Sequence, residues 1–155
     1  MFDVMIPFDN ENLWFPRGGT SYSNQIRIAP GGAGNVAIGL SILGGTVAFI
    51  GKAGDDHLGK LYVQTMRKHK IYSNIFLEGQ LPTGLAIVFV HKQKERSFLV
   101  CRGANDNLDS EEIRRSGGII EKSKYLYFSG YSMINEPQRS AILEAIRIAR
   151  KSGVK

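Results

Sequence analysis

The spacing of hydrophobic positions along the chain predicts helices in several places. Apolar residues recur at helical spacing from Leu58 onwards, behind two adjacent aspartates, and predict a capped amphipathic helix that continues to about Lys70. Two further helices are predicted, one beginning at the capping-box sequence 109–112 and one over 136–152, with a proline in its first turn and a glycine at its end. Helices therefore recur along most of the chain.

Short apolar runs between the helices predict strands of two kinds. The runs at 46–50 and 125–128 lie between helices, as the buried parallel strands of an α/β body do. The runs at 74–77, 84–91 and 96–102 follow one another without helices and predict a small antiparallel sheet, which the segment 25–29 joins and in which 91–95 forms a polar hairpin. Only two strands then remain for a parallel sheet that four helices should cover, so we expect the body to be incomplete.

A glycine cluster, PGGAGNVA at 30–37, opens the first predicted helix, which is expected over 33–43 with Val36, Leu40 and Leu43 facing inward. Glycines let a ligand lie against the backbone, and the free N–H groups of a helix start are donors. Asn35, one turn into the helix, both donates and accepts hydrogen bonds. This combination favours a sugar or another polyol over a lone phosphate.

At these residues the chain resembles the ribokinase-like carbohydrate kinases, the PfkB family. The Gly-Gly pair, the helical asparagine and the downstream Gly44 and Gly54 fall in register with its first signature. Three further segments agree, namely GDDHLG at 54–59, PTGLA at 82–86 and RGAN at 102–105. The resemblance implies a three-layer α/β body with an incomplete parallel sheet, plus an antiparallel lid. It covers a single partial domain over 1–155, with lid strands within about 14–30 and 73–103.

The resemblance also implies a sugar site. Asp3 takes the place of the family's sugar-binding aspartate, whose carboxylate accepts from two hydroxyls, and Asn35 would hold another hydroxyl. The backbone N–H groups of the glycine pair would face the sugar, and two lid residues would cover its apolar face. For the residues that end the second lid strand, a substrate contact and a turn role are equally open. The implied substrate-binding residues are Asp3, Gly31, Gly32, Asn35, Ala86, Val88, Arg102 and Asn105.

The reaction implied by the resemblance is transfer of the ATP γ-phosphoryl group, with Mg²⁺, to a sugar hydroxyl. The family's catalytic aspartate lies in a later Gly-Ala-Gly-Asp type motif that this sequence lacks. Asp3 is also expected to arrive after the first central strand of the body. We therefore expect the sugar-binding half of a kinase, without its nucleotide-binding part and inactive alone. The resemblance further implies dimerisation through the lid, and it leaves the choice among ribose, fructose, nucleosides and 2-keto-3-deoxygluconate open.

Two other nucleotide-binding motifs resemble parts of the glycine-rich sequence, and the second of them is rejected. The segment 32–37 also fits the G-x-G-x-x-[GA] fingerprint of a dinucleotide-binding Rossmann domain, although only a short strand broken by Pro30 precedes it. The segment 54–60 has P-loop spacing, but Leu61 replaces the magnesium-binding Ser or Thr, so a strand-to-helix corner is expected there. A non-catalytic sugar-binding or dimerisation module is the alternative from another functional class.

Composition narrows the functional classes further. The net charge of +6 is carried mostly by basic residues at helix ends, without the interleaved aromatic residues of a nucleic-acid surface, so no nucleic-acid partner is expected. The longest apolar run is too short to cross a bilayer, and the N-terminus lacks the pattern of a signal peptide. The single cysteine, Cys101, is compatible with a reducing cytosol and is expected to pack in a strand. We expect a cytoplasmic protein without a metal site, since its three histidines are isolated.

Overall fold

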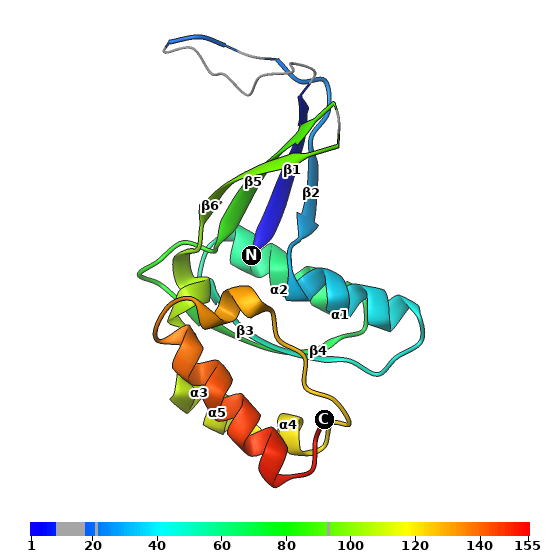
Figure 1. Ribbon diagram of the computed structural model, residues 1–155, viewed down its shortest axis with the longest axis vertical. Coiled ribbons are helices and arrows are strands. Elements are labelled where there is room, and N and C mark those ends of the chain that lie inside the picture. The colour runs from blue at the N-terminus through cyan, green and yellow to red at the C-terminus, as the bar shows by residue number, and fades with distance from the viewer. Residues whose placement is uncertain (9–17, 21, 93) are drawn as a thin grey trace.

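The computed structural model describes residues 1–8, 18–20, 22–92 and 94–155 of the chain. Two separate sheets are present, one of four strands in the order β2-β1-β5-β6 and one of two strands, β3-β4. Figure 1 shows the four-stranded sheet at one end of the molecule and the two-stranded sheet among the helices at the other. We call the first the lid sheet and the second, with its helices, the body.

The lid sheet is built around β1 (Phe2–Phe8) and β5 (Leu85–His91), which pair in parallel. The short β2 (Arg27–Pro30) pairs antiparallel with β1, and β6 (Arg96–Cys101) pairs antiparallel with β5. Three of its strands lie where the sequence predicts them, but β1 was not predicted. Asp3 lies inside this lid strand.

The body strands β3 (Ala48–Gly54) and β4 (Tyr72–Glu78) pair in parallel, and the helix α2 (His57–Lys68) connects them. The prediction that 74–77 belongs to the antiparallel lid was therefore wrong. Parallel neighbours need a crossover connection, and α2 supplies it, whereas the absence of a helix between β4 and β5 suggested a continuous meander. The lid sheet thus receives no strand from this segment.

The remaining helices agree with the sequence except in two details. The capping box is present at α3 (Ser110–Arg115), where Asp109 and Glu112 exchange side-chain and backbone hydrogen bonds. A separate short helix, α4 (Gly117–Glu121), follows it and was not predicted. Pro137 is the N-cap of α5 instead of lying in its first turn. The helical elements not yet given are α1 (Ala33–Ile42), α5 (Gln138–Lys151) and the 3-10 turns η1 (Gly103–Asn107) and η2 (Gly130–Met133).

The segment 125–128, predicted to be a body strand, is not a strand in the structure. Its backbone is bonded on one side only, where the Leu126 N–H donates to the Lys155 carbonyl at 2.7 Å and the Lys155 N–H donates to the Lys124 carbonyl at 3.2 Å. This alternation is that of a parallel pair. Among the described residues no strand pairs with 125–128 on its other side, so the predicted strand lacks the neighbour that would complete it.

Two hydrophobic clusters form the core. One lies between α3, α4 and α5 and is built on Ile113, Ile120 and Ala145, and the other joins the lid to α1 and α2. In the second, the Phe2 ring of β1 packs edge-on against Tyr62, with ring centroids 5.2 Å apart. The face of α1 predicted to point inward is instead open, since Leu40 is 48% exposed and Leu43 is 84% exposed. The side of α1 that is buried carries Ala37 instead, which belongs to the second cluster.

Candidate functional site

Asp3 lies at the base of the lid sheet, level with Ala29 of β2 and Ala86 of β5. Its carboxylate lies against Gly31, so closely that a methyl group added to this glycine would overlap the Asp3 oxygens. Burial raises the pKa of the Asp3 carboxyl, and the charges of the N-terminal amine and Arg96 act in the opposite direction. The site therefore contains a partly desolvated carboxylate, which hydrogen-bond donors of a ligand would stabilise in its ionised form.

The two glycines beside Asp3 have different roles: Gly31 is hydrogen-bonded within the fold, whereas Gly32 begins α1. The Gly31 N–H donates to the Met1 carbonyl at 3.0 Å, which ties the loop to β1 and leaves this amide engaged within the fold. The prediction that both glycines present their amides to a ligand was thus wrong for Gly31. Gly32 is the N-cap of α1, with a positive φ of 49° that favours glycine, and no side chain caps the helix. Since the first turn of α1 has no acidic residue either, the helix start remains a donor surface.

Three more of the predicted residues surround this surface. Asn35 is exposed in the first turn of α1. Ala86 pairs with Asp3, and Val88 lies two residues further along β5, so both face the same side of the lid sheet as the carboxylate. Both are only 2% exposed, which makes this side an apolar floor behind Asp3. The structure therefore brings Asp3, Ala86 and the start of α1 together.

Arg102 and Asn105 lie on the opposite wall, at η1, where both have structural partners. The Asn105 side-chain oxygen accepts from the Gly84 N–H at 2.9 Å, and Gln138 of α5 donates to the Asn105 carbonyl at 2.7 Å. Arg102 is ion-paired with Asp106 and donates to the Tyr131 carbonyl at 2.9 Å. The turn role left open by the sequence is therefore present. Both residues nonetheless line the same cleft as Gly31 and Gly32, so a ligand there would meet them.

The corner at 54–59 holds the start of the lid strand β5 against the body. Asp56 caps α2 by accepting from the Gly59 N–H at 2.7 Å, and it also accepts from the N–H and the hydroxyl of Thr83, each at 2.7 Å. Burial alone would raise the pKa of Asp56, but the hydrogen bonds from Thr83 and Gly59 outweigh it and lower the pKa. The expected strand-to-helix corner is confirmed. The link to Thr83 joins residues 27 positions apart, and no local pattern in the sequence indicates it.

Tyr62 is a second residue that the sequence did not connect with the site. It was predicted only as part of the apolar face of α2, yet it is 4% exposed and packs against Phe2, the neighbour of Asp3 on β1. Burial raises the pKa of its hydroxyl, and the negative charge of Asp3 adds to that rise. Its hydroxyl also lies where a side chain on Gly34 would have to go. Tyr62 therefore fixes the distance between α1 and the strand that carries Asp3.

The arrangement of strands excludes the dinucleotide-binding interpretation. A Rossmann unit needs parallel strands of one sheet on both sides of the glycine-rich turn. Here the preceding strand β2 is antiparallel to its neighbour in the lid sheet, whereas the following strand β3 belongs to the body. The Asp3 carboxylate beside Gly31 would moreover repel a pyrophosphate.

No cluster of three or more His, Cys, Asp or Glu side chains able to hold a metal ion occurs within residues 1–8, 18–20, 22–92 and 94–155. In the same ranges, none of the helices combines the length and the apolar character needed to span a membrane. Cys101 lies in β6 as expected for a strand residue, but it is exposed and not packed.

Comparison with known proteins gives a family match over nearly the whole chain. The profile of the pfkB family of carbohydrate kinases matches residues 3–155. Probable fructokinase-7 from Arabidopsis thaliana is 36% identical over 140 residues, which are 88% of this chain and 41% of that protein. Fructokinase-2 from Oryza sativa subsp. japonica is 34% identical over 128 residues, 81% of this chain and 38% of that protein. The chain thus spans less than half the length of these relatives.

Solved structures show the same fold over the whole chain. Adenosine kinase from Sinorhizobium meliloti superposes with a TM-score of 0.86 at 26% identity, covering 100% of this chain and 52% of that one. Fructokinase from Halothermothrix orenii superposes with a TM-score of 0.80 at 22% identity, covering 99% of this chain and 52% of that one. At 22% identity, the similarity to the Halothermothrix orenii fructokinase shows a shared fold only.

Proposed function

This chain belongs to the pfkB family of carbohydrate kinases, and on that basis we propose that it is the sugar-binding part of a kinase that phosphorylates fructose or a closely related sugar. Fructose is the first candidate because the relatives at 34–36% identity carry the name fructokinase. The observation that carries the proposal is the Asp3 carboxylate, held at Gly31 between the lid floor and the start of α1.

The groups around Asp3 suit a polyhydroxylated ligand. The carboxylate accepts from two neighbouring hydroxyls, and Asn35 is exposed close by, able both to donate and to accept. Ala86 and Val88, both buried, form the apolar layer of the lid sheet beside the carboxylate. Asp3 and Asn35 bind and orient the sugar, and the lid strands limit the access of water to it. Such positioning supplies a large share of the rate in phosphoryl transfer.

ATP and Mg²⁺ would supply the phosphoryl group and neutralise its charge, as the family implies. The described residues do not fit these groups. The helix start at the glycine pair faces the Asp3 carboxylate, which repels phosphate, and no carboxylate cluster for a metal is found in the described ranges. We therefore propose that the 155-residue chain binds sugar but does not turn over ATP.

The experiment is a pair of assays on the purified chain. Differential scanning fluorimetry with fructose should show a stabilisation that Asp3→Asn abolishes. Asp55→Asn, a matched change at an exposed aspartate, should retain it. Coupled measurement of ADP release should show no turnover above the Asp3→Asn background. Stabilisation by fructose that survives in Asp3→Asn would overturn the proposed site, and ADP release that depends on Asp3 would overturn the proposed inactivity.

The lid sheet supports a second proposal, namely assembly into a homodimer through its outer face. Ile28, Val4, Ile87 and Leu99 are paired in one row across the four strands, on the side opposite Asp3. Ile28 is 55% exposed and Leu99 is 63% exposed, so the two ends of the row lack cover. Leu99→Lys is expected to convert a dimer to a monomer in analytical ultracentrifugation. A wild-type chain that is monomeric at all concentrations tested would remove this proposal and would also weaken the alternative of a dimerisation module.

A further inference from the structure

The amino group of Lys52, near the C-terminal end of β3, is surrounded by oxygen atoms from three other elements. It lies 2.9 Å from a carboxylate oxygen of Glu112 in α3 and 3.5 Å from one of Glu78 at the end of β4, and it donates to the Asn107 carbonyl at 3.2 Å. The Asn107 side-chain amide in turn donates to Glu78 at 3.3 Å. Lys52 therefore connects both strands of the body sheet, and the helix α3, to the last residue of η1.

This cluster is partly removed from water, which makes its one positive charge important. The side chains of Lys52, Glu78 and Glu112 are 12%, 17% and 13% exposed, and within the part of the chain that the structure describes no other cation pairs with either carboxylate. Burial alone would lower the pKa of the Lys52 amino group, but the hydrogen bonds and charges of Glu112 and Glu78 outweigh it and raise the pKa. Without this cation, two poorly solvated negative charges would repel each other.

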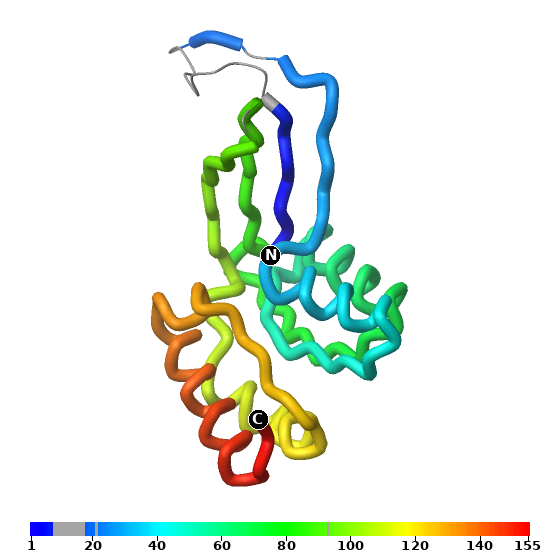
Figure 2. The backbone as a smooth tube through the Cα atoms, turned by 45° about the vertical axis from the view of Figure 1, so that its right-hand side comes forward, coloured from blue at the N-terminus to red at the C-terminus, as the bar shows by residue number. Residues whose placement is uncertain are grey.

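The turn η1 joins the lid to the body and has bonds to both. On the lid side, the Gly84 N–H, just before β5, donates to the Asn105 side chain at 2.9 Å. On the body side, Gln138 of α5 donates to the Asn105 carbonyl, and Lys52 donates to the Asn107 carbonyl. Figure 2 shows the chain after β6, in yellow-green, passing from the lid into the body. Lys52 thus supplies the attachment of η1 to the body sheet.

We propose that Lys52 is a positioning residue of the sugar site, whose charge holds η1 against the body sheet so that Arg102 and Asn105 keep their places on the cleft wall. Both residues line the cleft together with Gly31 and Gly32. Lys52 acts without touching the sugar, because its effect passes through the backbone of the turn. This inference rests on the proposed function for its ligand, fructose, whereas the attachment of η1 is testable without any sugar.

The experiment compares Lys52→Met with a control that destabilises the chain elsewhere. Methionine is an unbranched side chain without the charge. Ile148→Ala shortens a buried side chain of α5, about 15 Å along the helix from the residue that bonds η1, Gln138. Isothermal titration calorimetry, at a temperature where every variant is folded, should show fructose affinity about tenfold weaker in Lys52→Met and unchanged in Ile148→Ala. An equal loss in both variants, or no loss in Lys52→Met, would overturn the proposal.

A second substitution tests whether the charge is the cause. In the double variant Lys52→Met, Glu78→Gln, one of the two carboxylates is replaced by an amide, which can donate to Glu112 and accept from Asn107. Fructose affinity should return to within about threefold of the wild type. This change removes the repulsion but does not restore the packing of the lysine side chain. A double variant that binds no better than Lys52→Met would therefore overturn the proposal.

Hydrogen–deuterium exchange locates the effect without sugar. In Lys52→Met, amides of 103–108 should exchange about tenfold faster than in the wild type, whereas those of β1 and β5 should be unchanged. Unchanged exchange at η1, or faster exchange throughout the chain, would contradict the attachment given to Lys52. If the wild type does not bind fructose but η1 exchanges faster in Lys52→Met, the proposed function fails and the attachment stands. Equal fructose binding by the wild type and Lys52→Met would have the opposite meaning.

Discussion

The lid sheet and the body sheet differ in how fully their backbone groups are paired. In the lid, β1 and β5 each have a bonded neighbour on both sides, whereas among the described residues β3 and β4 pair only with one another. Both edges of each central lid strand are therefore hydrogen-bonded. The register between the strands fixes the face of the sheet on which Asp3 lies. Within the residues that the structure describes, the body consists of the single strand pair β3–β4 and its helices. Backbone pairing therefore fixes the lid strands more fully than the body strands.

The two regions meet at Gly59, and the largest effect is expected there. A methyl group on this residue would overlap the backbone oxygen of Gly54, the last residue of β3, and would crowd the hydroxyl of Thr83, which precedes β5. Gly59→Ala should lower the free energy of unfolding by about 3 kcal/mol or more, measured by urea denaturation. Gly39→Ala is the control, because nothing lies within 4 Å of its added methyl. It should be neutral or stabilising by up to about 1 kcal/mol. A harmless Gly59→Ala would mean that lid and body are not joined through this corner.

The second effect concerns the hydrogen bonds that connect Asp56 to the start of β5. Asp56→Asn should cost about 2 kcal/mol at pH 7, because the charge-assisted bonds to Thr83 and Gly59 are weakened. Asp55→Asn removes only an exposed ion pair with Lys60, so it should cost under about 0.5 kcal/mol.

The same residue predicts a pH dependence. The folded pKa of Asp56 lies below its ordinary value of 3.8, so its stabilisation is fully present above that value and is lost as the pH falls through the folded pKa. Urea denaturation between pH 5 and the acid range should show this loss in the wild type and a smaller one in Asp56→Asn. Parallel curves for the two proteins would contradict the role given to Asp56.

The smallest expected effect is a difference in amide hydrogen exchange rate between the two sheets. Amides in the centre of β1 and β5 should exchange about tenfold more slowly than those of β3, because the latter has an open edge. Hydrogen exchange of the wild-type chain measures this directly. Slower exchange in β3 than in β5 would reverse the comparison between the two sheets.

Features that depend only on residues close together in the sequence could be predicted from it. The Asp56 cap and the capping box at Asp109 are of this kind, because cap and helix lie within a few residues. The segment 125–128 was misjudged for the opposite reason, since an apolar run becomes a strand only where another strand meets it. The pairing of β4 likewise depends on its partner β3. For Asn105, sequence alone could not decide between substrate and turn, because its bond to Gly84 spans 21 positions.

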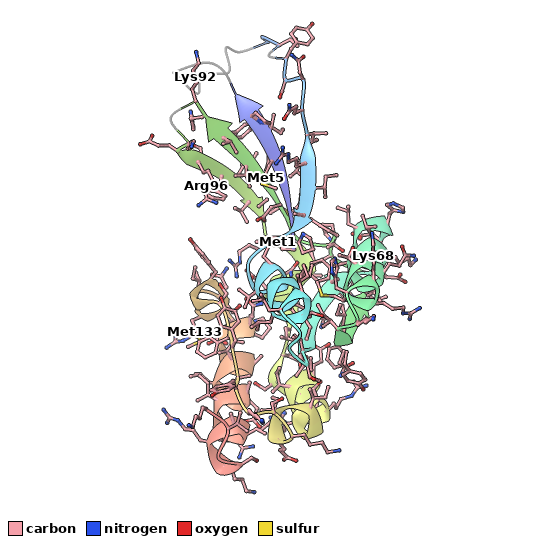
Figure 3. All side chains as sticks on the ribbon, turned by 90° about the vertical axis from the view of Figure 1, so that its right-hand side faces the viewer. Met1, Met5, Lys68, Lys92, Arg96 and Met133 are labelled. Atoms are coloured by element: carbon pink, nitrogen blue, oxygen red, sulfur yellow. The ribbon has the colours of Figure 1, made fainter. Side chains whose placement is uncertain are left out.

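Only the site residues that lie in the family's sequence motifs could be predicted. Resemblance put Asp3 near the glycine pair, and the structure places its carboxylate against Gly31. The bond from Gly31 to Met1 and the position of Tyr62 against Phe2 arise from packing between β1, α1 and α2, which the spacing of motifs in the sequence does not indicate. Figure 3 shows Met1 at the base of the lid sheet, with Met5 and Arg96 further along it. The charge of Arg96 therefore reaches Asp3 from another strand.

The adjacent residues Phe2 and Asp3 give the lid strand β1 a double attachment. Phe2 is 2% exposed against Tyr62 in the body, and Asp3, pointing to the other side, meets the glycine loop. A sugar held by Asp3 would bind only the folded chain, since the loop and the strand come together only there. By mass action, a sugar at 100 times its dissociation constant would add about 2.7 kcal/mol to stability. The folded fraction of the chain would then rise with the concentration of such a sugar.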